Sequence, residues 1–366
     1  MLERITKYRR DLHQIPELEL TLPKTQAYIK NALSELPCIL MEPIPYSIAA
    51  FFDNGKDSTI AFRSDMDALA VNEATGRSFA SRHEGCMHAC GHDGHMAMLL
   101  GFAHELAGYY QKLPHNVLLL FQPGEESPGG AELICNSGIF EQLRVKRIFG
   151  FHLWPAIKAG VIATRKNEFM ARSSEVKIDI IGKSAHSAKY KEGIDALEIG
   201  MRFLNDVYDM EKAIDSHVYR LLRFGKFTSG TVCNVVSSCT RMEGTLRAFQ
   251  DETYSYMRNE IESIAKRYEA QTSAKFQLDI NTGYPAVMND ESLTTQVLNE
   301  NPEIIELAEP EMISEDFAHY QRKMPGVFFF LGTGTGIALH NDHFDFDEHV
   351  LLKGIEMYKK LSWMKF

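Results

Sequence analysis

The sequence predicts an α/β protein with a mixed, mostly parallel sheet, interrupted by an inserted ferredoxin-like α+β domain. Strand-like runs that are apolar on both faces alternate with helical patterns over residues 1–171 and again over 283–366, as in parallel sheets covered by helices. The strands of residues 172–282 instead alternate apolar and polar residues, which is typical of an antiparallel sheet with one face in water. A chain of 366 residues is long enough for two domains.

The first segment alternates helices and strands. Apolar residues at helical spacing, closed by a proline, mark the first two helices. Short, wholly apolar runs mark buried strands. In chain order, the expected elements are helices at 2–14 and 24–36, strands in YSIAAFFDNG and STIAFRSD, a helix at about 94–110, a strand at 117–121, a helix from GGAELI onward and a strand in RIFGFHLW.

The inserted segment begins with EVKIDIIG, which places Val176, Ile178 and Ile180 on one face of a strand. A helical pattern follows at about 193–213, with apolar positions at Leu197, Met201, Leu204 and Val207. Next come strands in VYRLLRFGKF and TRMEGTLRAF, a helix at about 252–270 and a strand in AKFQLDI. This βαββαβ order is the ferredoxin-like arrangement. After residue 283 the strand GVFFFLG and a final helix resume the α/β pattern.

The composition argues against several classes of protein. A formal net charge of −10 and a pI near 5.8, with no long run of Lys and Arg, argue against a nucleic-acid or anionic-membrane partner. No stretch approaches the length of a membrane span, and the first residues lack the apolar core of a signal peptide. Six scattered cysteines do not resemble a disulfide framework. These features predict a reduced, cytoplasmic protein.

Residues capable of metal binding or catalysis follow the buried strands. Open α/β sheets bind ligands at the carboxyl ends of their strands, so side chains at these ends are expected to converge on one crevice. The candidates are Asp65 and Asp67 at the end of IAFRSDMD, Glu125 and Glu126 in LLLFQPGEES, His152 in RIFGFH, His340 after the glycine-rich loop of FFFLGTGTGIALH, and Cys90 and His92 in the loop of MHACGHDGHMAM.

Each candidate alone has an ordinary structural explanation, such as a solvated Glu-Glu turn or a hydrogen-bonded core histidine. Together, one cysteine, three histidines and two glutamates at loop ends favour a site for borderline-soft divalent metals, which accept thiolate, imidazole and carboxylate ligands. Five ligands exceed what one tetrahedral ion needs, so two ions are expected.

Two alternative functions come from other classes of protein. A cysteine hydrolase would use Cys90 as nucleophile and a nearby histidine as base, but it gives no role to Glu125, Glu126, His152 or His340. A non-catalytic metal-binding or scaffolding protein would keep the ligands. It would not need Glu125 beside the candidate ligand Glu126.

Eight spaced motifs occur in the order seen in M20-type metallopeptidases. They are RSDMDALA, HACGHDGHMAM, FQPGEESPGGAELI, GFHLWP, GKSAHSA, NVV…MEGTLRAF, SEDF and LHNDHFDFDE. The chain most resembles the amidohydrolase subfamily that includes hippurate hydrolases, auxin-conjugate hydrolases and N-acetyldiaminopimelate deacetylases. The resemblance covers nearly the whole chain. It implies a two-metal catalytic domain and an inserted lid domain.

The resemblance also implies roles for single residues. The metal ligands would be Cys90, His92, Glu126, His152 and His340, with Glu125 as the catalytic base and Asp65 in support. In the lid, His186 resembles the transition-state histidine, while Asn234 and Arg247 match positions that hold the substrate carboxylate. The chain departs from the family at Leu69-Ala70, where Leu-Pro is usual, and in SAKYKEG, where a proline is usual. These departures concern lid geometry and substrate choice.

The predicted function is therefore hydrolysis of the amide bond of N-acyl amino acids or short peptides by a metal-activated water, with Glu125 as general base. A narrower alternative is that the protein is an N-acetyldiaminopimelate deacetylase of lysine biosynthesis. Two divalent ions are expected, Zn or Mn first and Co or Ni next. A homodimer is also expected, because the edge strands of a small sheet need cover and because many family members pair through the lid.

Overall fold

The computed structural model describes residues 1–365, and its backbone contacts divide the chain into two units. The first unit consists of Met1–Phe169, Val287–Pro310 and the chain from Glu315 onward. The second unit consists of Met170–Ala286 and Glu311–Ser314. It extends beyond the expected insertion of 172–282 at both ends. Nothing in the residue types of Glu311–Ser314 indicates that this short segment is part of the second unit.

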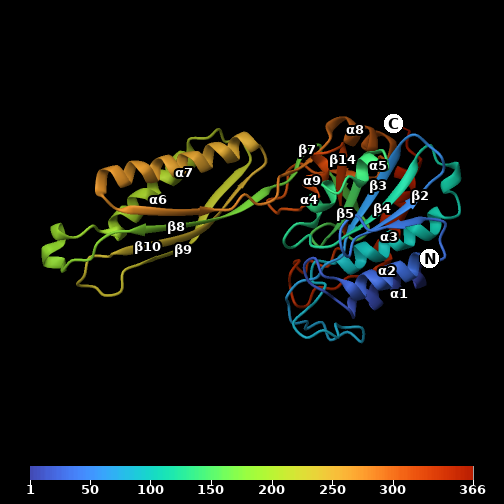
Figure 1. Ribbon diagram of the computed structural model, residues 1–366, viewed down its shortest axis with the longest axis horizontal. Coiled ribbons are helices and arrows are strands. Elements are labelled where there is room, and N and C mark those ends of the chain that lie inside the picture. Colours follow the sequence, from blue (N-terminus) through green and yellow to red (C-terminus); the bar gives the residue numbers. More distant parts are fainter. Residues whose placement is uncertain (366) are drawn as a thin grey trace. The chain divides into compact units, whose positions relative to one another are not determined.

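The first unit contains an eight-stranded sheet in the order β1-β2-β4-β3-β5-β14-β6-β13 (Figure 1). The neighbours β4–β3, β3–β5, β5–β14 and β6–β13 are parallel, and the other pairs are antiparallel. The predicted fold class, with its mixed and mostly parallel sheet, is thus confirmed. The strands are β1 Ile39–Met41, β2 Ile48–Phe52, β3 Thr59–Asp65, β4 Asn116–Gln122, β5 Val145–Trp154, β6 Ile162–Thr164, β13 Ile305–Glu306 and β14 Gly326–Gly332.

Helices of the first unit cover both faces of this sheet (Figure 1). They are α1 Leu2–His13, α2 Pro23–Leu33, α3 His92–Leu106, α4 Gly130–Cys135, α5 Ile139–Gln142, α8 Glu291–Glu300, α9 Ala318–Gln321 and α10 Leu351–Trp363. Short 3₁₀ turns lie at Tyr110–Lys112 and Glu348–Val350, and β7 (Asn167–Met170) pairs with β12 (Val287–Asn289). No helix within residues 1–365 is long and apolar enough to cross a membrane.

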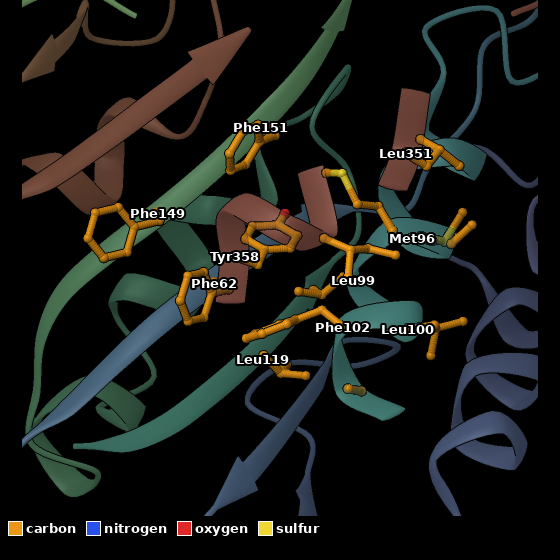
Figure 2. Packing of buried hydrophobic residues seen from close by; sticks show 14 of the residues in the cluster. Phe62, Met96, Leu99, Leu100, Phe102, Leu119, Phe149, Phe151, Leu351 and Tyr358 are labelled. Carbon is orange, nitrogen blue, oxygen red and sulfur yellow. The ribbon is translucent and has the colours of Figure 1, made fainter. Parts of the chain in front are cut away.

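The core of the first unit forms where α3 and α10 pack on the sheet. The ring of Phe62 on β3 lies 5.1 Å from those of Phe102 on α3 and Tyr358 on α10, measured between centroids, and all three are fully buried (Figure 2). Phe149 and Phe151 of β5 extend the same layer. This packing fixes α3 against the strands, so the loop before α3 is held at the carboxyl ends of β3 and β5.

The second unit has the predicted ferredoxin-like topology. Its antiparallel sheet has the order β11-β8-β10-β9, and α6 and α7 cover one face (Figure 1). Val176, Ile178 and Ile180 are fully buried beneath these helices, as predicted. The elements are β8 Arg172–Ile181, the 3₁₀ segment Ser187–Glu192, α6 Ala196–Lys212, β9 Arg220–Ser229, β10 Cys239–Ala248, α7 Asp251–Thr272 and β11 Lys275–Ile280.

The expected apolar face of α6 is partly wrong. Leu197 and Met201 are 41% and 51% exposed. The buried stripe of α6 instead runs through Ile199, Phe203 and Val207. Asp195 caps the helix by accepting the N–H of Leu197 at 2.9 Å, so the helix begins at Ala196, which is buried, and Leu197 lies on the outer face. Both faces of α6 carry apolar residues, and spacing alone could not choose between them.

A buried network of charges joins α1 to the start of α3. The guanidinium of Arg9 donates to Asp93 at 2.8 Å and pairs with Asp345 at 2.7 Å. His13 contacts the same oxygen of Asp93 at 2.7 Å and lies 3.3 Å from Glu73. Burial opposes a charge on His13, but Asp93 and Glu73 outweigh it and raise the pKa of His13 to about 9, despite the nearby charge of Arg9. His13 is therefore charged at neutral pH.

This network predicts a specific loss of stability at alkaline pH. The folded-state pKa of His13 lies above its ordinary value of 6.5, so its stabilisation is fully present below pH 6.5 and is lost as the pH passes about 9. The difference corresponds to about 3 kcal/mol. Urea unfolding from pH 6 to 10 is expected to show this fall in wild type but not in His13→Gln. Parallel pH profiles for the two proteins would contradict the assignment.

Candidate active site

Five side chains with metal-binding atoms converge in the first unit, at the carboxyl ends of its central strands. The Sγ atom of Cys90 lies 3.4 Å from Nε2 of His152 and 3.4 Å from Nε2 of His340. Nε2 of His340 lies 3.2 Å from Oε1 of Glu126. A backbone bond from the N–H of His340 to the carbonyl of Ala89, at 2.9 Å, holds the glycine-rich loop beside Cys90.

These donors form two adjacent sets that share Cys90. One set is Cys90, His92 and His152, and the other is Cys90, Glu126 and His340. Within each set, the candidate ligand atoms lie within 4.8 Å of one another. A third set joins His92 and Glu126 to Glu125. Two neighbouring groups of thiol, imidazole and carboxylate suit two divalent ions of borderline softness.

Hydrogen bonds prepare two of the histidines for a metal. Nδ1 of His92 lies 2.8 Å from the carbonyl of Asp67, and Nδ1 of His152 lies 2.7 Å from the carbonyl of Leu153. A carbonyl only accepts, so each Nδ1 carries the proton and each Nε2 presents a lone pair. Nε2 of His92 is buried and has no hydrogen-bond partner among the described residues. This orphaned acceptor fits a metal ligand.

Asp65 supports the site through its contacts with Arg63 and His95. It accepts a bond from Arg63 at 2.9 Å and lies 2.6 Å from Nδ1 of His95. Nε2 of His95 accepts the N–H of Leu153 at 2.9 Å, so the proton of His95 is on Nδ1 and points at Asp65. Asp65 also lies 3.7 Å from Nε2 of His92. Its carboxylate therefore orients the ring of His95 and forms no hydrogen bond with Nε2 of His92.

Asp67 holds the Glu125–Glu126 turn. Its two carboxylate oxygens accept the backbone N–H groups of Glu125 at 2.9 Å and Glu126 at 3.0 Å. Because the carbonyl of Asp67 also orients His92, one residue fixes both the glutamates and a candidate ligand. Burial, together with Glu315 and Glu126 nearby, raises the pKa of Glu125 well above its ordinary value. A carboxyl group placed this way can accept and return a proton.

The geometry does not favour Cys90 as a nucleophile. Burial, with Glu126 and Glu125 nearby, raises the pKa of its thiol well above the ordinary range. Nucleophilic cysteines instead have lowered pKa values in electropositive surroundings. Cys90 is also adjacent to Glu126 and two histidine Nε2 atoms, which is the neighbourhood of a ligand.

The three predicted lid residues lie in the second unit. His186 and Asn234 are exposed neighbours, since the N–H of Ser187 donates to the carbonyl of Asn234 at 3.1 Å. Nδ1 of His186 accepts the N–H of Ala188 at 3.2 Å, so its proton is on Nε2. Arg247 is half-buried on β10, and its Nη1 donates to the carbonyl of Met312. These residues share a unit with one another but not with the ligand cluster.

Several supporting residues were not predicted. Arg63 and His95 lie within apolar runs. A charged or imidazole side chain in an otherwise apolar run was the signal in the sequence that could have identified them as candidates. Glu315 and Asp316 lie in the motif SEDF and are buried with their carboxylates within 4.8 Å of that of Glu125. The motif itself was visible, but its place beside Glu125 depends on tertiary structure.

Comparisons with known proteins identify the family of this chain and its overall fold. The model of the family described as peptidase family M20/M25/M40 matches residues 61–363. An uncharacterized hydrolase of Staphylococcus epidermidis is 34% identical over 98% of this chain and 97% of its own. An N-acetyldiaminopimelate deacetylase of Brevibacillus brevis is 34% identical over the same shares. The structure of the YXEP protein of Bacillus subtilis, a dinuclear metal-binding peptidase of the M20 family, superposes with a TM-score of 0.85 at 28% identity, covering 99% and 97% of the two chains.

Proposed function

This chain belongs to peptidase family M20/M25/M40, a family of metal-dependent hydrolases, and from that premise we propose that it hydrolyses the amide bond of N-acyl amino acids. The observation that carries the proposal is that Cys90 belongs to both sets of three candidate ligands, and that Glu125 directly precedes the proposed ligand Glu126. A pure metal-binding protein would have no use for a second, buried carboxylate at that point.

The proposed ligands of two divalent ions are Cys90, His92, Glu126, His152 and His340, with Cys90 shared. Zn and Mn suit this mixture of donors best, and Co or Ni would also fit. Ions bound there supply a Lewis acid for the amide carbonyl and make hydroxide available near neutral pH.

Glu125 has the proposed role of general base and acid. Its carboxylate takes the proton of the attacking water and delivers it to the departing amine, which is typically worth ~10²–10⁴-fold in rate. Asp67 supports this role by fixing the backbone of Glu125. The second-unit residue His186, with its proton on Nε2, would donate to the oxyanion of the tetrahedral intermediate.

The proposed substrate carries a free carboxylate. Arg247 and Asn234 would bind it, because the acidic chain as a whole repels anions and needs a local cation to hold one. The relatives named N-acetyldiaminopimelate deacetylase, from Brevibacillus brevis and Ligilactobacillus salivarius, support an N-acetyl amino acid of that kind as the narrower alternative. Short peptides share the same amide and carboxylate.

A substrate panel tests this proposal. N-acetyl and N-benzoyl amino acids, N-acetyldiaminopimelate and dipeptides are each compared with the matching C-terminal amide, using enzyme loaded with Zn or Mn. Wild type is expected to prefer the free carboxylates, and Arg247→Ala is expected to lose more kcat/KM on them than on the amides. Arg241→Ala is the control, because Arg241 lies on the same strand but pairs with Asp179. Equal losses on acids and amides would remove Arg247 from substrate binding.

We also propose a homodimer formed through the second unit, with His186 acting in the partner's site. β9 and β11 are the edges of the four-stranded sheet, and edge strands need cover. Four exposed apolar residues of this unit line one groove with a volume of about 530 Å³: Tyr190, Leu197, Val232 and Val235. Such a patch favours burial against a second copy.

Complementation between two inactive variants tests the dimer. Glu125→Ala and His186→Ala chains carrying different tags are co-expressed and the mixed dimers are isolated. The chain that keeps Glu125 would receive an intact His186 from its partner, so roughly one complete site of two is expected to recover activity. His217→Ala, which changes another exposed histidine of this unit, is expected to stay active by itself. Mixed dimers without recovered activity would show that His186 does not act across an interface.

A further inference from the structure

Asp93 follows the proposed ligand His92 in the chain and is fully buried. It occupies the first turn of α3 and uses both carboxylate oxygens. Oδ1 accepts the N–H of Gly94 at 2.9 Å. Oδ2 receives Nε of Arg9 at 2.8 Å and Nδ1 of His13 at 2.7 Å. Two cations from α1 therefore converge on one oxygen of the residue that follows His92.

Arg9 is itself held rigidly. Besides Asp93, it pairs with Asp345 at 2.7 Å and with Glu348 at 3.4 Å. Its guanidinium carbon lies 5.0 Å from the ring centre of Phe79 and 4.4 Å from that of Phe346. Only 1% of Arg9 is exposed. Because ion pairs and aromatic rings surround the guanidinium, it is held in a single position and can anchor Asp93.

The loop between Cys90 and His92 has little room to shift. Gly91 adopts a φ of +83°, and a Cβ there would lie 3.0 Å from Leu153. A Cβ on Gly94, one turn on, would lie 2.6 Å from Phe346. The bond from Nδ1 of His92 to the carbonyl of Asp67 forms only while the start of α3 stays in this place. Anchoring Asp93 therefore fixes where Nε2 of His92 points.

From this geometry we infer that Arg9 and His13 are positioning residues for the metal site, acting on Cys90 and His92 through the carboxylate of Asp93. The inference rests on the proposed function, because it concerns the support of two proposed ligands. It assigns α1 a role in metal affinity. None of its atoms needs to touch an ion.

The test uses metal-free full-length protein titrated with Co²⁺, followed by the thiolate-to-cobalt absorption and by chelator competition. All measurements are made below the unfolding temperature of every variant, with folding checked by circular dichroism. Arg9→Met and Asp93→Asn are each expected to weaken Co²⁺ binding by about 10- to 100-fold, the usual effect of losing support behind a ligand. The double variant is expected to be no weaker than either single one, because both changes break the same link.

Arg10→Met is the matched control. Arg10 is the next residue of α1 and pairs with Glu348 at 2.7 Å, without a hydrogen bond or ion pair to Asp93. It is expected to bind Co²⁺ like wild type. Should Arg9→Met fail to fold, His13→Gln replaces it in the same cycle with Asp93→Asn. Folded variants with wild-type affinity, additive losses, or an equal loss in Arg10→Met would overturn the inference. A wild type without the thiolate absorption would instead contradict the proposed ligand Cys90.

Discussion

Arg63 is the buried cation that three carboxyl groups beneath the candidate site share, and the site depends on this interaction. Its fully buried guanidinium donates to Asp65 at 2.9 Å and pairs with Glu315 at 3.0 Å and Asp316 at 2.8 Å. Gln122 completes the set by accepting from its Nε at 2.8 Å. Buried carboxylates without a partner are costly, and loss of one member of such a cluster commonly costs ~3–5 kcal/mol. Through Asp65 the cluster orients His95, and through Glu315 it borders Glu125.

Around this centre, the proposed ligands come from the start of α3, from β5 and from loops, and neighbouring residues hold these segments in place. Asp67 fixes the glutamate turn and one histidine ring, and Asp93 ties the start of α3 to α1. These contacts hold the donor atoms in fixed positions relative to one another. Preorganisation of this kind is what a metal hydrolase requires, because donors that must first rearrange bind ions weakly and misplace the reacting groups.

The sequence reveals the parts of this arrangement that follow from local pattern. Glu126 lies four residues after β4 and His152 near the end of β5, so their convergence could be predicted from the rule that parallel strands end at one edge. The outer position of Leu197 was missed because Leu197 and Met201 also stand at helical spacing, although the longer apolar stripe through Ile199, Phe203 and Val207 is the buried one. The partners of Arg63 and Arg9 could not be predicted either. Apart from Asp65, two positions along the chain, Arg63 pairs with distant residues such as Asp316, and Arg9 pairs with Asp93, 84 positions away; no local signal encodes such pairings.

The central claim is that the two adjacent glutamates have different roles: Glu126 is a metal ligand and Glu125 is the general base. It is tested most directly by measuring metal content and kcat together in Glu125→Gln and Glu126→Gln. Elemental analysis is expected to find both ions retained in Glu125→Gln, with kcat lower by ~10²–10⁴-fold because only proton transfer is lost. Glu126→Gln is expected to lose an ion or bind it more weakly. Equal metal loss in the two variants, or a Glu125→Gln enzyme of normal kcat, would contradict the account.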